Sequence, residues 1–239
     1  MIIFFRRVNL PSLNENLLAN FLFSKRDVVH ATNLATMSNS FALTHGEVSL
    51  RVIKHRDAKT IERLVLSNRE WLRPWEATNP HGPTSFDFKA QIRGLLKQLE
   101  NDEGLPFLIL YKGEIVGQLN VANILHGSVS SCVMGYWITP DVAGNSITPT
   151  ALALAMDYMF KVVGLHRVEI DIRPENAASV RVVEKLGLRF EGLKKDYIHI
   201  NNAWRDHLVF ALTAGEVPDG VLNRWLRRKV PKMKYGFRK

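Results

Sequence analysis

The sequence predicts a mixed α/β domain, in which a mixed sheet carries helices on both of its faces. Short segments rich in Val, Ile and aromatic residues alternate along the chain with longer segments whose apolar residues recur every three to four positions. Glycine, proline and helix-capping residues separate these segments. The expected order is β-α-α-β-β-β-α-β-α-β-β, and strands interleaved with helices in this way are typical of a sheet covered on both sides.

Each expected strand is a run of β-forming residues bounded by turn residues. The first run alternates apolar and polar residues. Lys112-Gly113 joins the second and third runs as a tight hairpin, and Asn201-Asn202 joins the last two. The expected strands cover residues 47–53, 106–111, 114–124, 132–138, 167–172, 189–200 and 203–211.

Each expected helix combines an apolar face with a start or stop residue. Pro74 interrupts the segment that follows the first helix. The clearest boundaries are those of the fourth helix, which Asn176 begins and Gly187 ends. Two expected helices begin after Asp57 and after Ser85. The other three cover residues 149–163, 177–186 and 218–229.

The composition is that of a globular chain with a surplus of positive charge. Of 239 residues, 46% are hydrophobic and 23% are charged, which excludes a wholly disordered or collagen-like chain. The single cysteine, Cys132, excludes an intramolecular disulfide, and no histidine spacing indicates a metal site. No apolar run approaches the ~18 residues of a transmembrane helix. The net charge of +9 points to an acidic partner such as nucleic acid.

One domain, residues 46–215, accounts for nearly all of the expected elements. Residues 1–45 show no sustained period, and we expect an N-terminal extension that is disordered or that results from a mis-assigned start codon. Residues 216–239 are expected to form a short helix and a basic tail. Residues 221–239 carry eight Lys and Arg and no acidic residue, so the rest of the chain is close to neutral. Such a tail is either a solvated end or a contact to nucleic-acid phosphates.

A loop of small residues before the helix at 149–163 is a candidate phosphate-binding site. It contains Ala143, Gly144 and Ser146. Small side chains let phosphate oxygens approach backbone N–H groups at the positive end of a helix dipole. By itself the loop is more typical of an ordinary connection between a strand and a helix. The sequence contains no P-loop, nucleophile-elbow or zinc-protease motif.

A second block of sequence narrows the function. It reads PENAAS at 174–179, EKLGL at 184–188 and EG at 191–192, and GLHRV precedes it at 164–168. This pattern resembles the GNAT superfamily of acetyl-CoA-dependent N-acetyltransferases. The segments WLRPW at 71–75, KDY at 195–197 and WRDH at 204–207 resemble its RimJ/RimL branch, the ribosomal-protein-alanine N-acetyltransferases. The resemblance covers about residues 46–215.

The resemblance implies the GNAT fold, with a six- to seven-stranded, splayed mixed sheet, and acetyl-CoA as cosubstrate. The superfamily's pyrophosphate loop falls on residues 141–146, where Asp141 replaces a basic or amide residue and Ser146 replaces the last small one. We therefore expect weakened rather than abolished cofactor binding. Asn176 matches the asparagine that contacts the cofactor, and it can also be a helix N-cap. The implied cofactor-binding residues are Ile138, Thr139, Ala143, Gly144, Asn145, Ser146, Ile147, Thr148, Asn176 and Ser179.

Acetyl transfer to an amine needs a neutral amine and stabilisation of the tetrahedral oxyanion, and a proton for the departing thiolate assists it. We expect a backbone N–H at the end of the strand that contains Tyr136 to hold the oxyanion. Many superfamily members have a tyrosine that acts as the general acid at the position of Val183 in this chain. The branch implies that Ser179 supplies the proton instead. Direct attack with water relaying the proton stays open. The candidate bases are Glu76, Asp196 and His199, each of which is also compatible with a structural role.

The leading interpretation is an enzyme that acetylates the N-terminal α-amino group of a ribosomal protein beginning with alanine or serine. An α-amino group has a pKa near 7.7–8.0, so modest base catalysis suffices. Two alternatives stay open, a GNAT enzyme for a small amine and a weakly catalytic GNAT fold that binds ribosome or RNA. We expect a cytoplasmic protein without membrane association, which the basic tail would hold near ribosomal RNA. The candidate acceptor-binding residues are Trp71, Trp75, Glu76 and Tyr136.

Overall fold

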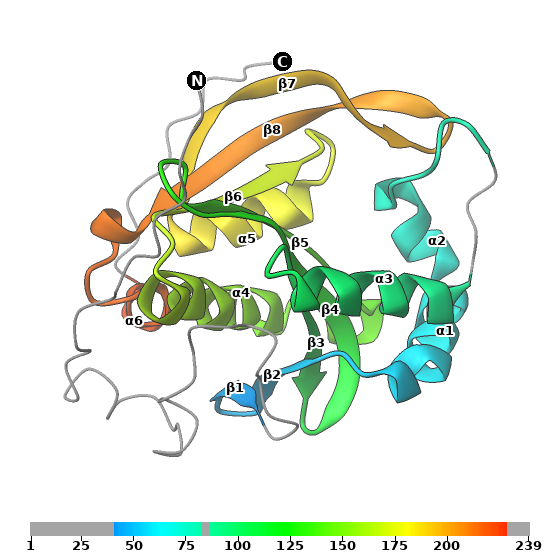
Figure 1. Cartoon of the computed structure of the whole chain (residues 1–239), viewed down its shortest axis with the longest axis horizontal. Coiled ribbons are helices and arrows are strands. Elements are labelled where there is room, and N and C mark those ends of the chain that lie inside the picture. Colours follow the sequence, from blue (N-terminus) through cyan, green and yellow to red (C-terminus); the bar gives the residue numbers. More distant parts are fainter. Residues whose placement is uncertain (1–40, 83–86, 229–239) are drawn as a thin grey trace.

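The computed structural model describes residues 41–82 and 87–228, which form an eight-stranded mixed sheet with helices on both faces (Figure 1). The strand order is β1-β2-β3-β4-β5-β6-β8-β7. Neighbouring strands are antiparallel except β5 and β6, which are parallel. The strands are β1 (Ala42–His45), β2 (Val48–Val52), β3 (Leu105–Tyr111), β4 (Glu114–Leu125), β5 (Ser131–Ile138), β6 (Arg167–Ile172), β7 (Arg189–Ile200) and β8 (Ala203–Thr213).

The helices divide between the two faces of the sheet. One core cluster joins α1, α2 and α3 to the sheet, and a second joins α4 and α5 to it, with α6 beside α4 (Figure 1). The helices are α1 (Ala58–Ser67), α2 (Arg69–Leu72), α3 (Phe88–Glu100), α4 (Ile147–Tyr158), α5 (Ala177–Leu186) and α6 (Val221–Leu226). The short helical turns are η3 (His55–Asp57), η4 (Arg73–Trp75), η5 (Pro140–Val142), the π-helical η6 (Met159–Val163) and η7 (Ala214–Glu216).

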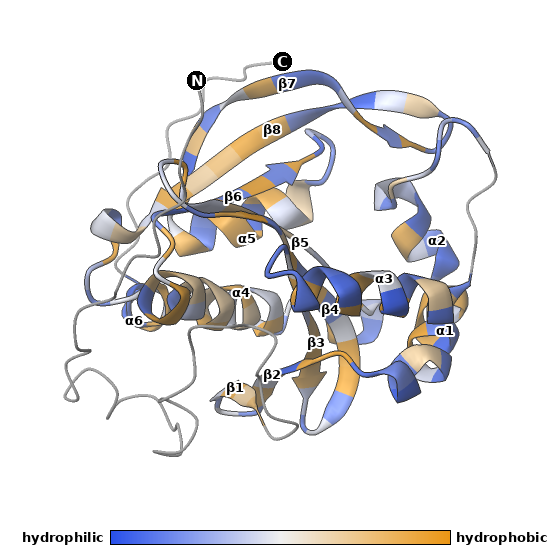
Figure 2. Cartoon of the chain, in the orientation of Figure 1, coloured by the Kyte–Doolittle hydropathy of each residue, from blue (hydrophilic) through white to orange (hydrophobic). Residues whose placement is uncertain are grey.

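The central strand β3 is buried on both of its sides. Phe107 and Ile109 belong to the core cluster that contains α4, whereas Leu108 belongs to the cluster of α1 and α3. Successive side chains of a strand point to opposite faces of the sheet. A strand covered on both faces therefore reads as a continuous apolar run. Figure 2 shows the contrast between β3, which is largely hydrophobic, and the edge strand β7, which carries many hydrophilic residues.

The parallel strands β5 and β6 separate part-way along their length. Residues 131–133 pair with residues 167–169, and β5 then continues to Ile138 without pairing with any strand on that side in the part of the chain described. On their other edges, β5 pairs with β4 and β6 pairs with β8. The splay expected from the sequence is therefore present, and it opens a gap between two parallel strands.

The fold class is confirmed, but the expected count of six to seven strands is wrong. β1 pairs with β2, so the sheet begins inside the segment 1–45 that the sequence assigns to an extension. A strand of four residues is too short to establish a hydrophobic period. Residues 1–40 and 229–239, which hold the rest of that extension and most of the basic tail, lie outside the described residues. Within the described ranges, no helix is long and apolar enough to cross a membrane.

Candidate active site

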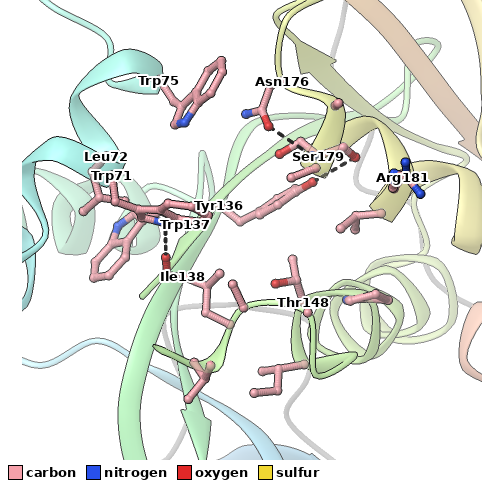
Figure 3. Close-up of a pocket in the computed structure, with 18 of the residues that line it drawn as sticks. Trp71, Leu72, Trp75, Tyr136, Trp137, Ile138, Thr148, Asn176, Ser179 and Arg181 are labelled. Carbon is pink, nitrogen blue, oxygen red and sulfur yellow. Dashed lines mark hydrogen bonds between the residues drawn. The ribbon is translucent and has the colours of Figure 1, made fainter. Parts of the chain in front are cut away.

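A pocket of about 590 Å³ lies at the carboxyl end of β5, between the first turns of α4 and α5 and the η4 turn (Figure 3). Its lining combines residues that the sequence assigns to the cofactor with residues that it assigns to the acceptor. From the first set it contains Ile138, Ala143, Gly144, Ser146, Ile147, Thr148, Asn176 and Ser179. From the second set it contains Trp71, Trp75, Glu76 and Tyr136. The two predicted sites therefore form one continuous cavity.

The connection from β5 to α4 presents backbone N–H groups to this pocket. Gly144 and Ser146 have left-handed backbones, with φ of +88° and +63°, which turn the chain into the helix. No side chain among the described residues caps α4, and Pro149 in its first turn has no N–H. The first N–H bonded within the helix is that of Thr150, which donates to the Ser146 carbonyl at 3.3 Å. The earlier N–H groups of this turn are therefore available to an anion, which the helix dipole favours.

Asn176 is both a helix cap and a pocket residue. Its Oδ1 accepts a hydrogen bond from the Ser179 N–H at 3.1 Å, which caps α5. The side-chain nitrogen points away from this bond (Figure 3). The oxygen therefore orders the helix start, while the nitrogen can donate to a ligand in the pocket.

The Tyr136 side chain extends from β5 to the first turn of α5. Its hydroxyl donates to the Ser179 carbonyl at 3.5 Å (Figure 3). Burial raises the pKa of Tyr136 to about 12, against a smaller opposite effect of the bond to Ser179. The phenol therefore stays protonated near neutral pH and acts as a donor.

The open edge of β5 is partly occupied by an indole. The Thr139 N–H donates to the Val116 carbonyl of β4 at 2.8 Å. Because peptide groups alternate in direction along a strand, those of Ile138 face the opposite side, which is the gap. Trp71 Nε1 donates to the Ile138 carbonyl at 2.9 Å (Figure 3). The Ile138 N–H faces the same gap, where the resemblance to the superfamily predicts an oxyanion donor.

Both carboxylates that line the described pocket are held by arginines. Glu76 forms an ion pair with Arg69. Glu175 forms one with Arg173 at 3.2 Å. The Arg173 guanidinium also lies 5.5 Å from the centroid of the Trp75 ring, so it fixes one wall of the acceptor end. The end of the pocket that the sequence assigns to the acceptor is therefore aromatic, and both acidic groups of the pocket are already paired.

Neither Asp196 nor His199 lines the pocket that contains Ser179. Asp196 has φ of +44° in an irregular part of β7, and its N–H donates to Asp206 at 3.0 Å. His199 Nδ1 lies 2.8 Å from the Thr78 hydroxyl, in the segment after η4. The β7–β8 hairpin carries both residues away from α5, although they follow it closely in sequence.

Two other expected cofactor residues lie outside the lining. Thr139 is buried, and Asn145 is exposed with its side chain donating to the Val142 carbonyl at 3.3 Å. Conversely, sequence reasoning misses Arg181 and Lys185, which line the pocket. Their spacing of four residues places them on one face of α5, a pattern that the sequence does contain.

Val183, the position where superfamily members carry an acidic tyrosine, is fully buried in the core. It belongs to the core cluster that joins α4 and α5 to the sheet. Position 183 therefore carries no acidic group, and its side chain does not line the pocket.

Comparison with known families decides the identity of the domain. The sequence model of the family described as "Acetyltransferase (GNAT) domain" matches residues 47–189, more than half of the chain. The chain belongs to the GNAT acetyltransferase family. It is therefore an N-acetyltransferase, and the α4 turn and the splayed strands lie inside the matched segment or border it.

Relatives of this GNAT acetyltransferase include enzymes of ribosomal proteins. [Ribosomal protein uS5]-alanine N-acetyltransferase of Escherichia coli (strain K12) is 29% identical over 184 residues, covering 74% of this chain and 93% of the relative. The solved structure of Mycobacterium smegmatis RimJ in complex with CoA-disulfide is 36% identical with a TM-score of 0.71, covering 78% of this chain and 91% of the other. That of ribosomal-protein-S5-alanine acetyltransferase from Vibrio fischeri is 28% identical with a TM-score of 0.66, covering 73% and 97%.

The pocket of this GNAT acetyltransferase fits acetyl-CoA, the acetyl donor of the family. The uncapped first turn of α4 suits the pyrophosphate, and Arg181 and Lys185 add positive charge at the rim. The gap between β5 and β6 suits a narrow, extended pantetheine arm that bonds to free peptide groups. When bound, acetyl-CoA supplies an activated thioester. No cluster of three or more His, Cys, Asp and Glu side chains that could hold a metal occurs in the described residues.

Proposed function

We propose that this enzyme acetylates the N-terminal α-amino group of a ribosomal protein whose first residue is alanine or serine. The observation that carries the proposal is the acceptor end of the pocket. Trp71 and Trp75 line it while remaining 42% and 38% exposed. Exposed indoles around a pocket mouth suit an extended peptide, because they offer a large apolar surface. Relatives named as alanine acetyltransferases of ribosomal proteins support the same acceptor.

The charge of the acceptor end separates a peptide from a polyamine. A polycationic amine needs carboxylates that remain available to it. Glu76 and Glu175 are each paired with an arginine, so a polycation would have to displace a guanidinium from each. A peptide N-terminus carries a single positive charge and places no such demand. The pairing therefore favours the peptide over the small polyamine.

The chemistry requires little of the protein beyond positioning. The neutral α-amine attacks the thioester carbonyl carbon, and the oxygen that becomes negative meets the N–H of Ile138 in the gap. The C–S bond then breaks, the amine nitrogen loses a proton to water, and the thiolate accepts a proton from the Ser179 hydroxyl, which water reprotonates. Because the pKa of an α-amine is near 7.7–8.0, a substantial fraction is neutral at pH 7.5 without a dedicated base. This accounts for a site in which Asp196 and His199 lie outside the pocket.

The test uses purified full-length protein, acetyl-CoA and peptides that begin with Ala or Ser, with thiol release as the readout. The matched control peptides have the same sequence with a blocked α-amine and a free internal lysine. We expect turnover only with the free α-amine. Turnover of spermidine but of no peptide would support the small-amine alternative, and failure to bind acetyl-CoA in calorimetry would refute the proposal.

The basic C-terminal segment would hold the enzyme near ribosomal RNA in the cytoplasm. Residues 221–239 carry eight positive charges and no acidic residue. Counterion release makes such contacts strongly dependent on salt. Deleting residues 229–239 is expected to reduce salt-sensitive ribosome association and to leave peptide turnover intact. Association that survives the deletion at every salt concentration would refute this role.

A further inference from the structure

α6 follows the segment matched by the family and lies against α4, the helix whose first turn faces the pocket. Its start is fixed by Asp157, a residue only 2% exposed, which accepts the N–H groups of Val221 and Leu222 at 2.7 and 3.1 Å. Gly220 precedes it with φ of +98°, and a Cβ there would lie 2.8 Å from Asp157 Oδ1. The beginning of α6 is therefore held tightly to the second half of α4.

The other end of α6 contacts the first turn of α4. Trp225 Nε1 donates to the Thr150 hydroxyl at 3.2 Å. That hydroxyl donates in turn to the Ser146 carbonyl at 2.8 Å. A hydroxyl that accepts one hydrogen bond and donates another is polarised by both, which strengthens the chain. α6 thus reaches the left-handed residue that shapes the phosphate-binding turn.

Trp225 also contacts the rim of the pocket. Its ring lies 5.9 Å from the ammonium of Lys185, which lines the pocket from the last turn of α5. An ammonium near an indole face is attracted to it and loses some of its freedom. One side chain therefore restrains both the backbone of Ser146 and a cation that α5 contributes to the pocket.

We propose that Trp225 is a positioning residue of the cofactor site, which fixes the Ser146 carbonyl through Thr150 and restrains Lys185 for the phosphates of coenzyme A. α4 is buried along its whole length, so its body cannot shift to compensate for a loose first turn. Left-handed backbone is unfavourable for serine, and the Trp225–Thr150 chain helps to hold it. Cofactor affinity thus depends on a helix outside the matched family segment.

The experiment measures the affinity of the full-length protein for coenzyme A by calorimetry, which requires no acceptor and is independent of the proposed function. Trp225→Phe keeps an aromatic ring but removes the N–H, and we expect it to weaken coenzyme A binding 3- to 10-fold. Asn223→Ala, on the exposed side of α6, is the matched control and should bind as the wild type does. Wild-type affinity of Trp225→Phe would overturn the proposal.

A second pair of variants keeps the test decisive if Trp225→Phe folds poorly. Thr150→Val removes the hydroxyl with little change of shape, and Thr150→Ser retains it. We expect Thr150→Val to weaken binding and Thr150→Ser to preserve it. Combining Thr150→Val with Trp225→Phe should add little to either change alone, because both break one chain. Equal affinities of the Val and Ser variants would refute a role for the hydroxyl.

Dephospho-coenzyme A, which lacks the 3′-phosphate, separates the two restraints. If Lys185 serves that phosphate, Lys185→Met should weaken binding of coenzyme A and leave that of dephospho-coenzyme A unchanged. Trp225→Phe should weaken binding of both ligands, because it acts on the Ser146 turn. A purely structural role for Trp225 would instead lower the melting temperature without changing either affinity, and that result also overturns the proposal.

Discussion

Replacing Asn176 separates the two tasks that its side chain performs. The oxygen caps α5 by accepting the Ser179 N–H at 3.1 Å, and the nitrogen is directed away from that bond. Asn176→Ala removes both groups. Asn176→Asp retains a capping oxygen but removes the donor and places a negative charge beside the pocket. Both substitutions should therefore weaken cofactor binding, the aspartate at least as much as the alanine because its charge repels the phosphates, and they should differ in stability.

The magnitudes follow from each lost interaction. Losing an N-cap costs about 1 kcal/mol, and in a domain of this size about 1 kcal/mol lowers the melting temperature by roughly 2–4 °C. Asn176→Asp should melt at or above the wild-type temperature, because a carboxylate at a helix N-terminus is favourable. A neutral hydrogen bond contributes about 0.5–1.5 kcal/mol, so Asn176→Ala should bind coenzyme A about 2- to 10-fold more weakly, and Asn176→Asp at least as weakly.

The assays are thermal unfolding monitored by circular dichroism and coenzyme A titration by calorimetry. Asp87→Ala is the matched control, since Asp87 caps α3 by accepting the Ala90 N–H at 2.9 Å and does not line the pocket. It should lower the melting temperature as Asn176→Ala does and leave the affinity unchanged. Wild-type affinity of Asn176→Asp would refute the assignment of the amide nitrogen as a donor to the cofactor.

Three further predictions concern other parts of the molecule. Ser146→Gly should raise the free energy of unfolding by about 0.5–1 kcal/mol, because relief of the left-handed serine backbone exceeds the added entropy of the unfolded chain. Lys112→Gly, at φ of +53° in a hairpin, is the control. A lower melting temperature of Ser146→Gly than of the wild type would contradict the prediction. Trp71→Phe should raise the KM for peptide about 3-fold without changing coenzyme A affinity, because it loses the bond to Ile138; an unchanged KM would remove Trp71 from the acceptor site. Hydrogen bonds from Arg167 and Arg189 lower the pKa of Glu191 from 4.5 to about 2, so its stabilisation is present above pH 4.5 and is lost as the pH falls toward 2. In urea titrations, the free energy of unfolding of Glu191→Gln should fall by about 1 kcal/mol less than that of the wild type as the pH is lowered. An unaltered pH dependence of the free energy of unfolding would contradict the ion pair.

Much of the fold could be predicted because its boundaries are set by neighbours in sequence. Asn176 caps α5 through a residue three positions away, and Gly187 ends the same helix with φ of +74°. The glycine and serine before α4 turn the chain into the helix by the same local rule. Such features are decided within one helical turn, so a sequence pattern can state them. β1 escaped prediction because four residues carry too little pattern.

The candidate site depends on both kinds of information. The sequence by itself determined the order of the elements apart from β1, the turn before α4 and the capped start of α5, because backbone sterics and capping act over a few residues. Only the tertiary structure decided which side chains meet. Trp71 reaches Ile138 across 67 positions, and Trp225 reaches Thr150 across 75. Asp196, in the irregular part of β7, does not line the pocket. These meetings follow from how the helices pack and where the sheet splays, and no local pattern encodes either.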